Sequence, residues 1–306
     1  MPKQTITTTE EKIEDALRPY QFHGVDIEEP SRGHEAISTC PFCDHKKFSV
    51  NIENGLFRCW SGSCAKQGNI TVFIRDYYDL CKEETTSSDY DKLAALSGFV
   101  SGVAAEQFGC VLSINRDEWL VPGYNHEKHL SNLYRFMDCK DKDGEWKKKL
   151  LPTPTLGHQL FNFHNYDDKK SAVHICEGWR DAIAWIETLA EIRMSDSRSV
   201  LDDVSVVAVP GVTSFKIGWA NLFADKNVYL LFDNDHPKYN DKGKAENDPA
   251  GVLGIKRTAS ILDAAKHKPA SINFLDWSGG LSKGYSTDYR DGMDLRDVLS
   301  QGLIDA

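Results

Sequence analysis

The chain has 306 residues, 41% of them hydrophobic and 27% charged, with a formal net charge of −10 at pH 7. This length predicts two or three domains, and the hydrophobic share indicates packed cores rather than disorder. The net charge excludes a broadly basic nucleic-acid-binding coat. No segment is apolar enough to span a bilayer and the first residues lack a signal-peptide core, so we expect a soluble, cytoplasmic protein with no membrane partner.

The first predicted elements are a short amphipathic helix over residues 10–17 and a hairpin over residues 47–58, with Asn54-Gly55 at its turn. Two pairs of cysteines flank the hairpin, the first separated by two residues and the second by four. Thiolates are ligands of Zn²⁺, and two cysteine pairs on adjacent turns close a tetrahedral site. The sequence therefore predicts a zinc ribbon over residues 32–70 with one structural Zn²⁺ bound by Cys40, Cys43, Cys59 and Cys64.

A helix capped by Asn69 is expected to follow the ribbon, so that residues 1–81 form a zinc-ribbon domain with flanking helices. Residues 82–89 are polar and show no periodicity, which favours a linker. Residues 90–168 predict a mixed α/β subdomain with strands beginning at Trp119 and Leu133 and a lysine-rich turn at residues 147–149.

From residue 169 to 306, short apolar runs alternate with helical segments. This alternation is typical of βαβ crossovers, and it predicts a doubly wound parallel sheet with helices on both faces. The expected strands are residues 172–176, 204–209, 228–232 and 271–275, and the expected helices are residues 180–192, 250–265 and 294–299.

Acidic residues follow these strands at the points where ligands bind in parallel sheets. Carboxylate oxygens are the ligands that Mg²⁺ and Mn²⁺ prefer, and clustered acids without a cation would repel one another. Any one acid at a strand end can instead be a helix cap. As a set, they predict a catalytic Mg²⁺ or Mn²⁺ site formed by Glu177, Asp233 and Asp235, with Asp294 at its rim.

The acidic motifs, Cys-Glu177-Gly-Trp-Arg-Asp-Ala and Leu-Leu-Phe-Asp233-Asn-Asp235, resemble those of the TOPRIM domain. A Cys-Pro-Phe-Cys ribbon, a mixed middle region and then TOPRIM is an order similar to that of bacterial and phage DNA primases. The resemblance implies a multidomain α/β and α+β protein. It also implies nucleotidyl transfer from ribonucleoside triphosphates on a single-stranded DNA template, with phage or plasmid as a possible source.

The resemblance further implies that the ribbon contacts the template and that a separate replicative helicase is a partner, since no Gly-x4-Gly-Lys-Ser/Thr loop occurs in the chain. Local basic stretches suggest phosphate contacts, and each lysine can equally be ordinary solvated surface. The residues expected to bind substrate or template are Arg58, Trp60, Lys66, Lys128, Arg135, Lys147 and Lys149.

Two alternatives remain open from the sequence: another TOPRIM enzyme, either a nuclease or a topoisomerase, and a catalytically inactive zinc-bearing module that binds single-stranded DNA. The sequence also departs from the family pattern, because residues 236–248 form a polar insertion after Asp235. A tolerated surface loop is the favoured interpretation of this insertion, and a flap over the active site is the alternative.

Overall fold

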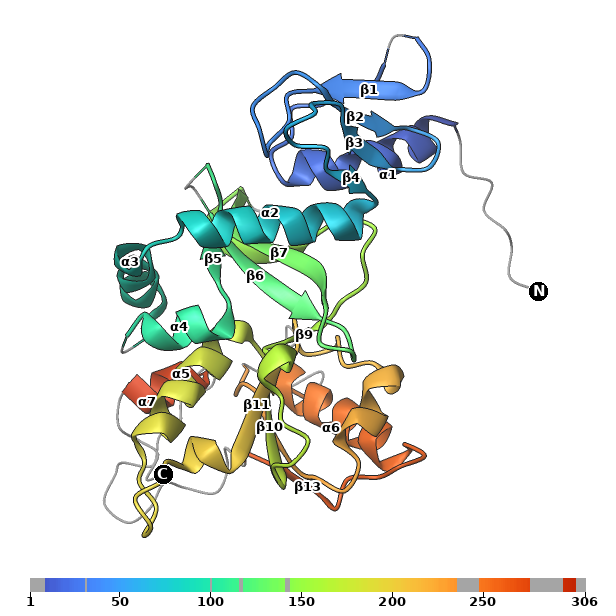
Figure 1. The fold of residues 1–306 in the computed structure, drawn as a ribbon. Helices are drawn as coiled ribbons and strands as arrows, with labels where there is room; N and C mark the ends of the chain where they lie inside the picture. The colour runs from blue at the N-terminus through green and yellow to red at the C-terminus, as the bar shows by residue number, and fades with distance from the viewer. Residues whose placement is uncertain are drawn as a thin grey trace, which may run out of the picture. The chain divides into compact units, whose positions relative to one another are not determined.

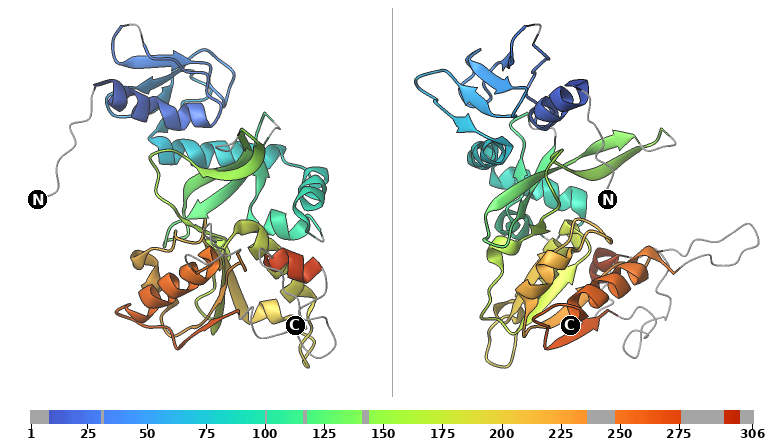
Figure 2. Two further views of the ribbon diagram at one scale, coloured as in Figure 1. Left: turned by 180° about the vertical axis from the view of Figure 1, so that it is seen from behind. Right: turned by 90° about the vertical axis from the view of Figure 1, so that its right-hand side faces the viewer.

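The computed structural model describes residues 9–30, 32–99, 101–115, 118–140, 144–235, 248–275 and 294–300. The chain divides into two compact units (Figures 1 and 2). The N-terminal unit consists of Met1–Thr85, Val111–Pro122 and Leu130–Gly157, and the C-terminal unit of Thr86–Cys110, Gly123–His129 and His158–Ala306. Within the described ranges, every helix is too short or too polar to cross a membrane.

The N-terminal unit begins with a helix, a four-stranded antiparallel sheet and a second helix, in this order along the chain. The sheet order is β1 (Glu35–Ser38), β2 (Phe48–Asn51), β3 (Phe57–Cys59) and β4 (Gln67–Gly68), with α1 (Thr9–Phe22) before it and α2 (Ile70–Glu84) after it. Phe73 of α2 packs edge-on against Tyr20, Phe48 and Phe57, all of which are buried. This aromatic core ties the small sheet to both helices, since aromatic side chains bury much of the apolar area of a small domain.

The predicted N-cap of α2 is confirmed. The side chain of Asn69 accepts a hydrogen bond from the backbone N–H of Val72 at 3.1 Å, which satisfies one of the free amides at the start of the helix. The predicted linker over residues 82–89 is wrong as a structureless segment. The helix α2 continues to Glu84, and α3 (Ser87–Ser97) starts almost at once with a capping box formed by Thr86 and Asp89.

The second part of the N-terminal unit is a set of antiparallel strands. It comprises β5 (Val111–Leu112), the start of β6 (Trp119–Tyr124), β7 (Leu130–Lys140) and β8 (Trp146–Pro152). The β7–β8 pair forms a long two-stranded arm (Figure 2). The predicted lysine-rich turn at residues 147–149 is wrong, because these lysines lie inside β8, where Lys147 pairs with Cys139 and Lys149 with Met137.

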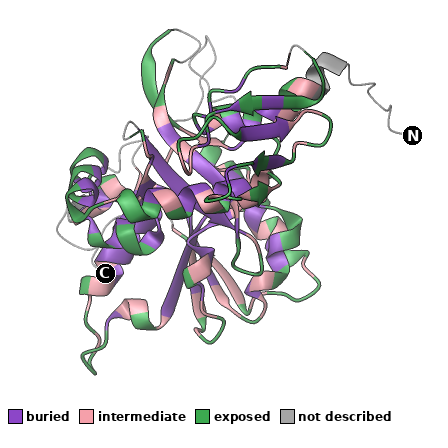
Figure 3. Ribbon diagram, turned by 45° about the horizontal axis from the view of Figure 1, so that its top comes forward, coloured by how far each residue is buried: buried purple, intermediate pink, exposed green. Residues whose placement is uncertain are grey.

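The C-terminal unit contains the alternating strands and helices that the sequence predicts. Its sheet has the order β13 (Ser271–Phe274), β12 (Asn227–Leu231), β10 (Ala172–Cys176) and β11 (Val204–Ala208), all parallel, with β9 (Leu160–Phe161) antiparallel to β11. The central strands are largely buried (Figure 3). The helices of this unit are α3, α4 (Val103–Phe108), α5 (Trp179–Glu191), α6 (Ala250–Asp263) and α7 (Leu295–Ser300), with single 3-10 segments at Phe163–Asn165, Val200–Asp202 and Ile217–Phe223.

The register of the sheet fixes where its strands end. Cys176 of β10 pairs with Ala208 of β11 on one side and with Leu231 of β12 on the other. The carboxyl ends of these three strands therefore lie level, and the residues that follow them share one edge of the sheet. The predicted middle subdomain, residues 90–168, does not coincide with one compact unit, since it contributes segments to both.

Candidate metal sites and nucleic-acid surface

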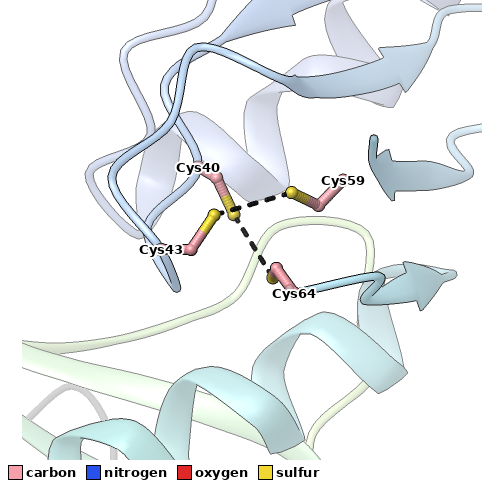
Figure 4. A group of neighbouring side chains, drawn as sticks. All are labelled: Cys40, Cys43, Cys59 and Cys64. Carbon is pink, nitrogen blue, oxygen red and sulfur yellow. Dashed lines mark hydrogen bonds between the residues drawn. The ribbon is translucent and has the colours of Figure 1, made fainter. Parts of the chain in front are cut away.

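Four cysteine thiols converge between the turns of the ribbon (Figure 4). The sulfur atoms of Cys40, Cys43, Cys59 and Cys64 all lie within 4.8 Å of one another. The Cys40–Cys64 sulfur distance is 3.9 Å and the Cys43–Cys59 distance is 3.7 Å. A tetrahedral site with Zn–S bonds of 2.3 Å has edges of about 3.8 Å, so the cluster fits one structural zinc ion bound by the four predicted ligands.

Glu177 and Asp233 follow neighbouring strands of the C-terminal sheet. Glu177 comes directly after β10, and its side chain accepts a hydrogen bond from the backbone N–H of Asp233 at 3.2 Å. Asp233 stands two residues after β12, and its Oδ1 is buried with no hydrogen-bond partner. The two predicted acids therefore meet at the carboxyl edge of the sheet, as the alternation of strands and helices suggested.

Asp235 follows β12 in the sequence, and its carboxylate lies against the first turn of α6. Its Oδ2 accepts a hydrogen bond from the N–H of Gly251 at 2.7 Å, so this carboxylate caps the helix. A Cβ atom at position 251 would lie 2.0 Å from the carbonyl oxygen of Asp233. Glycine is therefore required for the close approach of α6 to the chain that carries Asp233 and Asp235.

Three further charged residues lie at this edge and were not among the predicted site residues: Asp181, Arg296 and Arg180. Asp181, in the first turn of α5, is buried and pairs with Arg296 of α7, with 3.0 Å between Nε and Oδ1. Arg296 also pairs with Asp294, the predicted rim residue, which in turn accepts a hydrogen bond from the N–H of Asp297.

Arg180, beside Asp181 in the first turn of α5, interacts electrostatically with Asp181, Asp233 and Asp294. The sequence held one signal that Asp181 belongs to the site: it stands four residues after Glu177, in the first turn of the next helix.

The electrostatics of the edge are those of crowded acids. Burial, together with the carboxylates of Asp235 and Asp181, raises the pKa of Glu177 to about 7. Burial and the surrounding carboxylates raise the pKa of Asp233 to about 9. If all five carboxylates of the edge were ionised, its two guanidinium groups would leave negative charge uncompensated, so without a cation Asp233 holds a proton; the acids are Glu177, Asp181, Asp233, Asp235 and Asp294.

The buried, unpartnered oxygen of Asp233 and this crowding of carboxylates fit a divalent cation, which would take the place of the proton on Asp233. The acids do not already form a closed ligand set. Among the described residues, only the four cysteines bring three or more such ligand atoms within 4.8 Å of one another. Binding of a cation would therefore draw the carboxylates closer together than they stand here.

Gly251→Ala should destabilise the C-terminal unit by about 1–3 kcal/mol, because its methyl group meets the backbone of Asp233 and either α6 or the acidic loop must shift. Urea unfolding measures this effect. Gly218→Ala is the matched control, since a Cβ there meets nothing within 4 Å. An equal stability of the two variants would show that Gly251 is not needed for this packing.

Arg58 and Trp60 are the two predicted template residues that the ribbon brings together. The guanidinium carbon of Arg58 lies 3.9 Å from the centre of the Trp60 ring, which is 58% exposed. The indole N–H donates to Ser49 Oγ at 3.1 Å and so fixes the ring. Trp60 lines two hollows, of about 520 and 450 Å³; the first is also lined by Asn51, Asn54 and Gln67, and the second by Ile37, Lys46 and Lys47, among others.

Three other predicted residues are already engaged. Lys66 pairs with Asp76 at 3.0 Å, and Lys128 donates to the carbonyl oxygen of Tyr166. Arg135 is largely buried, pairs with Glu118 at 2.6 Å and lies over the ring of Phe22. A role in phosphate binding stays a prediction for each of them, and for Arg135 it requires the ion pair with Glu118 to open.

Lys147 and Lys149 are exposed and lie on the same face of β8, because side chains two residues apart in a strand point the same way. Lys148 lies on the other face and pairs with Asp138. Their predicted role in substrate binding stays a prediction. Residues 236–247 of the predicted insertion lie outside the described residues, and Asp248 pairs with Lys256.

The solved structures that are similar to this chain include the following three. The primase fragment of the bacteriophage T7 primase-helicase protein is 15% identical over 86% of this chain and 93% of its own length, with a TM-score of 0.45. The zinc-binding and RNA polymerase domains of Aquifex aeolicus primase are 14% identical over 97% and 83%, with a TM-score of 0.42. A DnaG catalytic core is 13% identical over 74% and 75%, with a TM-score of 0.44.

In structure, the chain is similar to bacterial and phage primases. No protein-family model matches the sequence, and no curated protein matches it. The identities are 13–15% and every TM-score is below 0.5, so the likeness concerns the fold alone.

Proposed function

We propose that this protein is a DNA-dependent primase that joins ribonucleotides on a single-stranded DNA template by metal-assisted nucleotidyl transfer. The observation that carries the proposal is the convergence of Glu177, Asp233 and Asp235 at the carboxyl edge of a parallel sheet, with an oxygen of Asp233 left unpartnered. The proposal includes the assignment of the C-terminal unit as a TOPRIM domain.

Glu177 and Asp233 would hold the divalent cation, and Asp235 would join them by rotating one oxygen away from the start of α6. A bound Mg²⁺ would supply charge neutralisation for the triphosphate and for the oxygens that attack and leave. Burial of Asp233 keeps water away from its carboxylate, so its interaction with a cation is stronger than at an exposed site. Asp294 is held by the N-terminus of α7 and by Arg296, which supports its predicted place at the rim.

Trp60 and Arg58 would receive the template on the ribbon. An exposed, fixed indole ring offers a stacking surface for an unpaired base, and the adjacent guanidinium group can pair with a phosphate. In the neighbouring hollow, the side-chain amides of Asn54 and Gln67 can donate hydrogen bonds to a base edge. The amide of Asn51 is engaged with Glu35 and with the backbone of Glu53 and Asn54. A separate helicase remains part of the proposal as a partner.

A labelled-ribonucleotide incorporation assay on mixed-sequence single-stranded DNA tests the proposed function. We expect short RNA products that require the template and Mg²⁺. Degradation of the template without RNA synthesis would instead favour a nuclease. Tight binding of single-stranded DNA with no product under any divalent cation would favour an inactive binding module, which the Trp60 surface on its own would also suit.

Trp60→Ala should weaken binding of single-stranded DNA by about 1–3 kcal/mol, the usual contribution of one base–aromatic stack. Trp60→Phe should keep most of the affinity, because it retains an aromatic face. Fluorescence titration with a labelled oligonucleotide at several salt concentrations measures both variants, and binding should weaken steeply with salt. An unchanged affinity in Trp60→Ala would remove this side chain from the template surface.

A further inference from the structure

Arg296 places a positive charge inside the acidic edge of the C-terminal unit. It is carried by α7, which packs against α5 (Figure 1). Its side chain is 18% exposed, and each part of the guanidinium group has a partner. Nε donates to Asp181 Oδ1 at 3.0 Å, Nη1 donates to the carbonyl oxygen of Ser97 at 3.3 Å, and Nη2 pairs with Asp294.

These contacts divide the five acids of the edge into two groups. Asp181 and Asp294 are joined to Arg296, whereas Glu177, Asp233 and Asp235 make no ion pair that the structure describes with this arginine. Asp181 is almost fully buried, and a buried carboxylate needs a positive partner close by. Arg296 therefore supplies for one group of acids what a divalent cation would supply for the other.

We propose that Arg296 is a resident cation of the acidic site. Arg296 neutralises Asp181 and Asp294, so that divalent cations bind only to Glu177, Asp233 and Asp235. It thereby limits both the number of ions that the site binds and the affinity for them. The proposal rests on the cation site of the proposed function, and it assigns Arg296 a positioning role rather than contact with substrate.

If Arg296 served only to hold α5 and α7 together, a different result would be expected. Removing such a tie would lower stability and leave the intrinsic affinity for cations unchanged or weaker. Removing a resident cation frees two carboxylates beside the site and takes away a positive charge that repels incoming ions. Affinity for a divalent cation should then rise, because charges a few ångströms apart interact strongly in a partly buried site.

Titration of the 306-residue chain with Mn²⁺, followed by the electron paramagnetic resonance of free Mn²⁺, tests the proposal. Arg296→Gln keeps hydrogen-bond donors but removes the charge. We expect it to bind Mn²⁺ at least about tenfold more tightly than the wild type, or to bind one further equivalent. Arg296→Lys restores the charge and should restore the wild-type titration.

Arg198→Met is the matched control, because Arg198 also pairs with two aspartates, Asp196 and Asp203, but at the exposed surface. It should bind Mn²⁺ as the wild type does. If Arg296→Gln does not fold alone, Mn²⁺ should restore its folded circular-dichroism spectrum; failure to do so overturns the proposal.

An Arg296→Gln titration equal to that of the wild type also overturns the proposal and leaves the cation site intact. Absence of Mn²⁺ binding in both proteins overturns the cation site itself, and with it the role of Arg296.

Discussion

Asp233→Asn should abolish nucleotide incorporation while making the metal-free protein more stable. The loss of activity should be at least about 100-fold, since the change removes an anionic ligand from the proposed metal site. The gain in stability has a different origin. Burial and neighbouring acids make the ionised form of Asp233 costly in the fold, and an amide of nearly the same volume does not carry that cost.

The pH dependence of stability separates the two effects. The pKa of Asp233 rises from 3.8 to about 9 on folding, so between these values the folded protein holds a proton that the unfolded chain has released. Stability of the metal-free wild type should therefore fall as pH rises through this range, by up to about 1.4 kcal/mol per pH unit. Glu177, with its pKa raised to about 7, adds to the slope below neutral pH.

In Asp233→Asn this slope should be shallower, and at pH 8 the variant should be more stable than the wild type by about 2 kcal/mol or more in buffer without Mg²⁺ or Mn²⁺. Urea unfolding at pH 5, 7 and 8 measures the slope and this difference. Asp263→Asn, at an exposed surface pair with Lys268, is the control and should change neither activity nor slope. Full activity in Asp233→Asn would refute the metal assignment.

Removal of zinc should unfold the ribbon and leave the C-terminal unit folded. Structural Zn²⁺ binding contributes about 10–16 kcal/mol in comparable small sites, as much as the whole stability of a typical domain. The four strands of the ribbon are only two to four residues long, so they are not expected to persist without the ion. Hydrogen exchange with and without a strong chelator should show loss of protection in β1–β4 and retained protection in β10–β12.

Two serine variants test this prediction, one by removing a zinc ligand and the other as the control. Cys64→Ser removes one of the four thiolates and should reproduce the effect of the chelator. Cys139→Ser changes a cysteine of β7 that lies outside the cluster and should leave both zinc content and exchange unchanged. One equivalent of zinc in Cys64→Ser, with full protection of the ribbon, would contradict the four-thiolate site.

The parts of the fold that the sequence predicted well are those with strong local patterns. The strands of the C-terminal unit are short apolar runs between helices, and the structure places them parallel and in register. The zinc ligands were predictable because thiol chemistry and spacing alone define them. The structureless character predicted for residues 82–89 and the turn predicted at residues 147–149 were wrong because polar composition was taken as absence of structure. The capping box at Thr86 and the pairing of β8 with β7 override that composition.

The site was predicted less completely than the fold. Sequence order brings Glu177 and Asp233 to adjacent strand ends, but it does not show that Arg296, more than 100 residues further on, turns back to pair with Asp181. Nor does it show that the carboxylate of Asp235 caps α6 or that Arg135 is held by Glu118. These are long-range contacts between charged side chains, and no local periodicity encodes them.

The most direct test of the central claim is to locate a divalent cation at the acidic edge. Anomalous diffraction from crystals of the wild-type protein soaked in Mn²⁺ gives the position of the ion. We expect a peak within about 2.5 Å of carboxylate oxygens of Glu177 and Asp233, with Asp235 turned toward it. A Mn²⁺-soaked crystal with no peak at these carboxylates, or with Asp233 still unpartnered, would contradict the proposed metal-assisted reaction.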